Sequence, residues 1–121
     1  MCSMMEKLKK NNDENLWSEI EQRGESPGKI KAYAMEFNNP YLYLFGGINN
    51  KRISNNNLYR FNLSNNNWEL LNVQGTPPSP RSYHEMSLID HENMVVFGGI
   101  QGTINEIETI FNDVYIYNIR E

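Results

Sequence analysis

The chain has 121 residues, 39% of them hydrophobic and 12% aromatic, which fits one soluble domain with a single core. Its net charge of -4, with one basic cluster at Lys7, Lys9 and Lys10, argues against nucleic acid as the main partner. Cys2 is the single cysteine, which excludes an intrachain disulfide, and no run approaches the ~18 apolar residues of a membrane span. Because the N-terminal residues lack the apolar segment of a secretory signal, we expect a cytoplasmic protein, with the nucleus as the alternative location.

Short strands are predicted along the first two thirds of the chain. Residues 1–15 are polar and are expected to form a solvated tail, and LWSEIEQ at 16–22 is expected to be a strand. The apolar or aromatic-rich runs that follow are typical of strands: KAYAMEF (31–37), YLYLFGG (41–47), NLYRFNL (57–63) and WELLNV (68–73). Asparagine clusters and prolines between these runs favour turns, so an all-β fold is predicted.

The last third of the chain repeats this pattern. Three further strands are predicted in the same order: SYHEMSLI (82–89), MVVFGG (94–99) and DVYIYNI (113–119). Trp17 and Trp68 lie 51 residues apart, the two glycine pairs lie 52 apart, and Tyr59 and Tyr115 lie 56 apart. The growing offset reflects a longer loop in the second copy, so the chain contains an internal repeat of about 50 residues.

The order of residues W…G…P…R…H…FGG…Y…W resembles the kelch repeat, whose ~50-residue unit is one four-stranded blade of a β-propeller. The resemblance covers about residues 16–120. The second unit keeps the motif at Gly75, Pro78, Pro80, Arg81, His84, Phe97, Gly98, Gly99 and Tyr115. In the first unit, Lys31 stands in place of the arginine and Ala34 in place of the histidine.

This resemblance implies an all-β fold of kelch-type β-propeller blades, about two four-stranded antiparallel blades in an incomplete ring. We expect a full blade at about 30–74, a partial blade at about 81–120, and a leading fourth strand at 16–22. Propellers contain roughly four to eight blades, so two cannot close a ring and the outer faces would stay exposed and apolar. The chain is then a piece of a longer kelch protein, a truncated product, or a protomer that self-associates.

The motif residues are expected to have structural roles. A glycine pair at the end of a buried strand permits positive φ and close approach of a neighbouring blade. Tyr59 and Trp68, on adjacent strands, can form an aromatic pair between blades, and the resemblance implies that Arg81 hydrogen-bonds between blades. We assign structural roles to Trp17, Gly46, Gly47, Tyr59, Trp68, Arg81, His84, Gly98, Gly99 and Tyr115.

Partner binding is expected on two rim loops. Residues 48–57 form a polar loop with Lys51 and Arg52, and residues 100–112 form an acidic and apolar loop with Glu106, Ile110 and Phe111. Exposed Ile110 and Phe111 would suit a partner anchor, and the alternative is that both fold back onto the blade.

No metal or cofactor is expected. His84 and His91 are seven residues apart in a predicted strand and turn, so they point to opposite faces, whereas the helical zinc motif needs two histidines four apart.

The resemblance implies a non-catalytic scaffold that binds an unidentified protein. The alternatives are a fragment of a kelch-propeller enzyme whose active site lies outside this chain, or a truncated product without its own function. Self-association is expected if the chain is complete.

Overall fold

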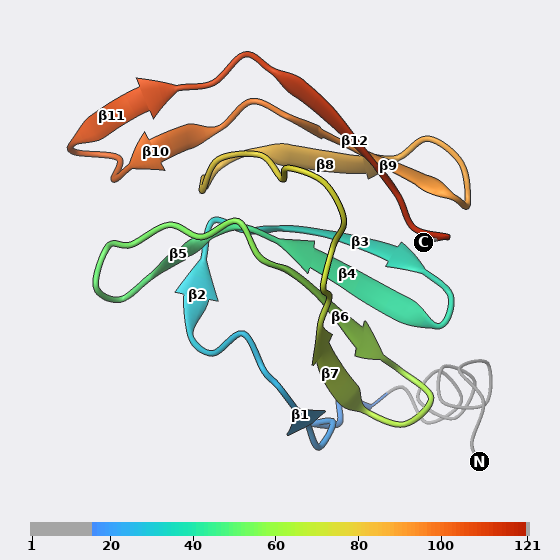
Figure 1. Cartoon of the computed structure of the whole chain (residues 1–121). Coiled ribbons are helices and arrows are strands. Elements are labelled where there is room, and N and C mark those ends of the chain that lie inside the picture. The colour runs from blue at the N-terminus through green and yellow to red at the C-terminus, as the bar shows by residue number, and fades with distance from the viewer. Residues whose placement is uncertain (1–15, 121) are drawn as a thin grey trace.

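The computed structural model describes residues 16–120, which form twelve strands and no helix (Figure 1). Within this part of the chain, nothing forms a helix able to cross a membrane. The tail predicted over 1–15 lies outside the described residues. The all-β prediction is therefore confirmed.

The first sheet contains five strands in the order β1-β7-β6-β4-β3. Four of them are antiparallel and follow the chain: β3 (Ala34–Asn38), β4 (Tyr41–Phe45), β6 (Leu58–Asn62) and β7 (Asn67–Leu70). The two-residue strand β1 (Arg23–Gly24) pairs with β7 in the parallel direction. This sheet is the predicted four-stranded blade with one short strand added at its outer edge.

The second sheet has three antiparallel strands in the order β12-β9-β8, namely β12 (Val114–Asn118), β9 (Asn93–Phe97) and β8 (Glu85–Leu88). Two small ribbons lie at one end of the sheets. Strand β2 (Ile30–Lys31) pairs with β5 (Ile48–Asn49), and β10 (Ile100–Gly102) pairs with β11 (Ile107–Ile110). Both ribbons are at the left end of the sheets in Figure 1.

The strand predicted over 16–22 does not form. These residues adopt no regular structure, and Trp17 is fully exposed. The free edge of β12, where a closing strand would pair, has β9 as its single neighbour in the sheet. A strand needs a hydrogen-bonded neighbour, and residues 16–22 pair neither with this edge nor with another strand of the described residues.

Equivalent hydrogen bonds recur in the two repeats. The Gly46 N–H donates to the Asn57 carbonyl over 3.2 Å, and the Gly98 N–H donates to the Asp113 carbonyl over the same distance. The partners are offset by 52 and 56 residues, which are the offsets found between the glycine pairs and between the tyrosines. The sequence repeat is therefore also a structural repeat.

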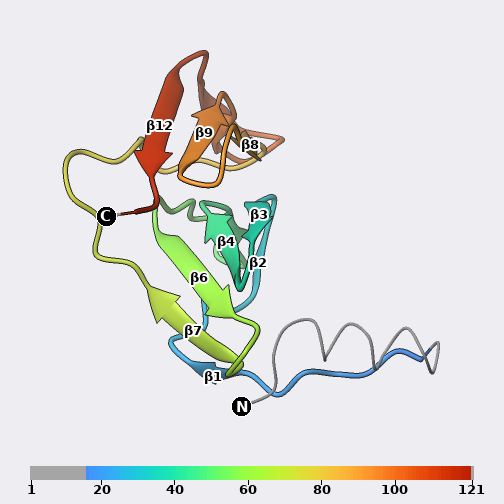
Figure 2. The ribbon, with the colours of Figure 1, turned by 90° about the vertical axis from the view of Figure 1, so that its right-hand side faces the viewer.

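The two sheets pack face to face around one core. Side chains alternate between the faces of a strand, so Tyr43, Phe45 and Leu58 lie on the face of the first sheet that meets Met94 and Val96 of the second. All five are buried. Figure 2 shows the second sheet stacked on one end of the first, and strands β3 and β8 are in contact across the interface.

The opposite face of the second sheet is open. Val114 pairs directly with Phe97, so both lie on this face together with Ile116. Their exposed fractions are 66%, 50% and 63%, which is high for strand residues of this kind. An exposed apolar face next to an open strand edge fits a partial propeller.

Candidate functional site

Residues 81–83, at the end of the connection between the two sheets, are hydrogen-bonded to the first unit at alternate positions. The Arg81 N–H donates to the Asn55 carbonyl over 3.2 Å, and the Gly47 N–H donates to the Arg81 carbonyl over 2.9 Å. The Tyr83 N–H donates to the Ala32 carbonyl over 2.8 Å. We call residues 81–83 the junction segment.

Ser82, which lies between Arg81 and Tyr83, is hydrogen-bonded to the second unit. The Ser82 N–H donates to the Ile100 carbonyl over 2.9 Å, and the Ile100 N–H donates back to the Ser82 carbonyl over 2.8 Å. The junction segment thus forms two isolated β-bridges, from Arg81 to Asn55 and from Ser82 to Ile100. It therefore ties together two regions about 50 residues apart in sequence.

Glycines allow this close approach. A Cβ on Gly46, where φ is 73°, would lie 2.6 Å from Cε1 of His84 and 2.9 Å from the Arg81 carbonyl oxygen. A Cβ on Gly99, where φ is 97°, would lie 2.7 Å from the Ser82 carbonyl oxygen. Both glycines therefore have the expected positive φ, and both are crowded by atoms of residues 81–84.

His84 forms a side-chain bridge between the sheets. It is buried, and its Nε2 lies 2.8 Å from the Phe45 carbonyl oxygen, so Nε2 carries the proton and donates it to that oxygen. The rings of His84 and Phe45 meet edge to face with centroids 5.4 Å apart, and Nδ1 has no hydrogen-bond partner. Burial lowers the pKa of His84 and keeps the ring neutral near pH 7.

These contacts with Phe45 give His84 a structural role. His91, the other histidine, is exposed. In residues 16–120, no group of three or more His, Cys, Asp or Glu side chains is arranged to hold a metal ion.

The side chain of Arg81 is fully buried and bonds within the second unit. Its guanidinium meets both carboxylate oxygens of Asp113, at 2.6 and 3.0 Å, and donates to the carbonyls of Gly98 and Ser79. The ring of Phe111 lies 3.9 Å away, centroid to Cζ. Hydrogen bonding from Arg81 lowers the pKa of Asp113.

The resemblance implied that this arginine hydrogen-bonds between blades. Here the main chain of Arg81 bonds to Asn55 and Gly47 of the first unit, whereas the guanidinium bonds to Gly98 and Asp113 at the two ends of the loop 100–112. The guanidinium partner, Asp113, was not identified from the sequence.

The aromatic pair of the first unit is formed. Tyr59 and Trp68 meet edge to face with centroids 6.4 Å apart, and Phe61 lies 4.9 Å from Trp68. Alternation along β6 puts these rings on the face turned away from the second sheet, so they do not fill the interface seen here. Trp17, which matches Trp68 in the sequence repeat, has no equivalent contact.

The two rim loops lie at the same end of the sheets (Figure 1). Lys51, Arg52 and Glu106 are exposed. The two expected anchors differ: Ile110 is 75% exposed, whereas Phe111 folds back over the guanidinium of Arg81. Ile110 is therefore exposed, as a partner anchor would be, whereas Phe111 follows the alternative and folds back onto the blade.

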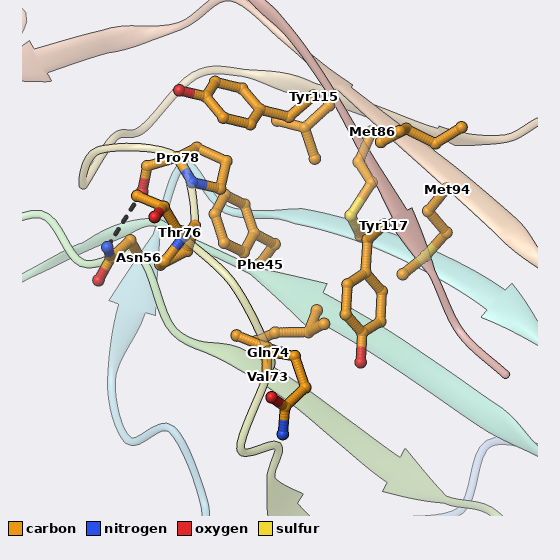
Figure 3. Close-up of a pocket in the computed structure, with 14 residues that line it drawn as sticks. Phe45, Asn56, Val73, Gln74, Thr76, Pro78, Met86, Met94, Tyr115 and Tyr117 are labelled. Carbon is orange, nitrogen blue, oxygen red and sulfur yellow. Dashed lines mark hydrogen bonds between the residues drawn. The ribbon is translucent and has the colours of Figure 1, made fainter. Parts of the chain in front are cut away.

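An apolar pocket lies between the sheets under the linker that follows β7 (Figure 3). Tyr115, Phe45 and Met86 line it, and the Asn56 side chain holds the linker by donating to the Pro78 carbonyl over 3.0 Å. Its volume is about 100 Å³. Small-molecule sites usually measure about 300–1,000 Å³, so this pocket is a packing gap rather than a ligand site.

Residues 5–121 match the family described as the KLHDC2/KLHL20/DRC7 Kelch-repeats domain. The chain belongs to the kelch-repeat family. Kelch repeats account for the glycine-ended strands and for the interface between the two blades.

Several kelch-containing proteins are similar to this chain. Tip elongation aberrant protein 3 of Schizosaccharomyces pombe is 29% identical over 106 residues, which cover 81% of this chain and 9% of that protein. Human Host cell factor 1 is 31% identical over 114 residues, which cover 88% of this chain and 6% of that protein. The kelch chain thus spans less than a tenth of either curated relative.

A solved structure titled "Structure of YjhT" is similar in fold. It has 25% sequence identity and a TM-score of 0.56, with coverage of 79% of this kelch chain and 26% of that chain. The match to about a quarter of a longer chain agrees with an incomplete propeller.

Proposed function

We propose that this kelch chain is a non-catalytic protein-interaction module whose partner contacts lie on the rim made by residues 48–57 and 100–112. Kelch-repeat domains are typically protein-interaction modules, and the rim exposes side chains such as Ile110 that do not pack in the core.

One observation carries the proposal. The buried polar side chains of the junction, His84 and Arg81, are engaged in contacts that hold the blades and the loop 100–112. Ile110, by contrast, is 75% exposed at the end of β11, where exposed apolar side chains suit a partner anchor.

The test compares two isoleucines at opposite ends of the second sheet. Ile110→Ser changes the proposed rim, and Ile89→Ser changes an isoleucine that is 60% exposed in the turn between β8 and β9. Proteins retained by the 121-residue chain are identified by quantitative mass spectrometry, and affinity for a purified one is measured by calorimetry.

We expect Ile110→Ser to weaken binding about tenfold, the loss typical of an interface anchor, and Ile89→Ser to leave it unchanged. Equal affinity of the two variants for the partner would show that the rim is not the contact surface.

A further inference from the structure

The cationic side chains of residues 16–120 are unevenly paired with carboxylates. Four arginines of residues 16–120 form ion pairs with carboxylates at 2.6 to 2.9 Å: Arg23, Arg60, Arg81 and Arg120. The other four cations of this part of the chain are exposed and have no carboxylate of the described residues within ion-pair distance: Lys29, Lys31, Lys51 and Arg52. All four lie in or beside the β2–β5 ribbon.

Two of these cations, Lys31 and Arg52, line a cleft between the two ribbons. Its lining includes Lys31, Arg52, Tyr83 and Ile104, and its volume is about 220 Å³. We call it the rim cleft. It is below the usual size of a drug-sized site, so it has room for one side chain of a larger partner. A second hollow, which includes Lys29, adjoins it and shares Lys31.

The wall of the rim cleft is held in place by main-chain bonds. Tyr83 has a positive φ of 58° and its N–H is bonded to Ala32 as part of the junction segment. Arg52 has a φ of 64°, and its N–H donates to the Asn49 carbonyl over 3.1 Å. A surface that is already ordered loses less entropy when a partner binds.

The rim cleft also has an apolar part. Ile104 is 62% exposed and Tyr83 is 51% exposed, and both line the same cleft as the cations. The facing ribbon carries Glu106 and Glu108, both exposed. A continuous polyanion such as RNA would be repelled by these carboxylates, whereas a short acidic peptide can contact the basic side alone.

We propose that the rim cleft binds an acidic segment of a partner protein, with one apolar side chain of that segment packed against Tyr83 and Ile104. This inference rests on the proposed function and adds the chemical class of the partner. The charge complementarity between an acidic peptide and the four cations supplies both its orientation and a faster encounter rate.

The test uses a short fluorescein-labelled peptide of glutamates around one leucine, titrated with the 121-residue chain and followed by fluorescence anisotropy. Lys31→Glu combined with Arg52→Glu changes the cleft. Arg23→Glu combined with Arg120→Glu changes the net charge by the same amount at exposed sites away from it. Circular dichroism first establishes that both double variants keep the native spectrum.

We expect the cleft variant to bind the peptide at least about tenfold more weakly than the wild type, and the control variant to bind within about twofold. Replacing the peptide leucine by glycine, or Ile104 by serine, should also weaken binding. Affinity should fall as salt is raised.

The proposal is overturned if both double variants bind the peptide equally, if the wild type does not bind it, or if single-stranded RNA binds more tightly than the peptide. If Ile110→Ser weakens binding of the protein partner but the wild-type chain does not bind the acidic peptide, this inference is refuted and the proposed function is not.

Discussion

Gly46→Ala should destabilise the fold by about 2–4 kcal/mol. A residue with a Cβ at a φ of 73° costs about 1–2 kcal/mol of backbone strain. The new Cβ would also lie 2.6 Å from the ring of His84 and 2.9 Å from the Arg81 carbonyl oxygen, so one or both must move. Loss of the bond from His84 to Phe45, with the Phe45 carbonyl left unsatisfied, adds about 1–2 kcal/mol.

Gly75→Ala is the matched control. Gly75 has a φ of 82°, but a Cβ there would have no atom within 4 Å. It should therefore cost the backbone strain alone, about 1–2 kcal/mol. Urea unfolding followed by the fluorescence of Trp68, which lies in β7, gives both free energies of unfolding. The difference between the two variants measures the crowding at the junction.

A double variant locates that crowding. In the background of His84→Ala, the ring next to Gly46 is gone, so Gly46→Ala should cost less than it does in the wild type. The reasoning is refuted if Gly46→Ala is no more destabilising than Gly75→Ala.

Three further predictions follow from the junction and the open face. Asp113→Asn should cost about 3 kcal/mol in chemical unfolding because it leaves the buried cation of Arg81 without its carboxylate, whereas Glu21→Gln, in an exposed pair, should cost under about 1 kcal/mol. His84 has a lowered pKa, so the unfolded chain takes up a proton more readily and stability is lost as the pH falls below about 6.5. His84→Gln should flatten the dependence of the free energy of unfolding on pH just below about 6.5. Expressed alone, the chain should self-associate through its open apolar face, and a monodisperse monomer in light scattering, with a cooperative thermal transition, would contradict this.

The repeat and its strands could be predicted because the same steric demand acts twice. A buried strand that ends close to the start of its own unit needs glycine there: a Cβ would lie 3.0 Å from the Lys31 carbonyl oxygen at Gly47 and 2.7 Å from the Ser82 carbonyl oxygen at Gly99. The alternation of apolar residues then fixes which side chains meet in the core, such as Phe45 and Val96.

The missing strand at 16–22 shows where local sequence fails. Trp17 has the motif residue and a suitable spacing, but strand formation depends on a hydrogen-bonded neighbour, and residues 16–22 pair with no strand of the described residues. The position of Phe111 depends in the same way on Arg81, which lies 30 residues earlier.

Asp113 was not identified because the expected match between the two repeats was wrong by one residue. The sequence placed Lys31 at the position of Arg81, but Lys31 pairs with Ile48 as Ser82 pairs with Ile100, and Ala32 and Tyr83 both have a φ of 58°. Ile30 therefore stands at the position of Arg81, and Tyr33 rather than Ala34 at the position of His84. The first unit has no arginine that could pair with a carboxylate there, so comparison of the repeats did not indicate the ion pair.

The alternating bonds of the junction segment also bear on how the chain opens. In proteins built from stacked repeats, each repeat can unfold as a separate unit when its contacts are mostly internal. Here the amides of Gly47 and Arg81 each donate to a carbonyl of the other repeat. The next residue, Ser82, is bonded to Ile100. The end of the first blade and the start of the second should therefore exchange their amide protons together. The boundary between the repeats in the sequence lies in the middle of one cooperative unit.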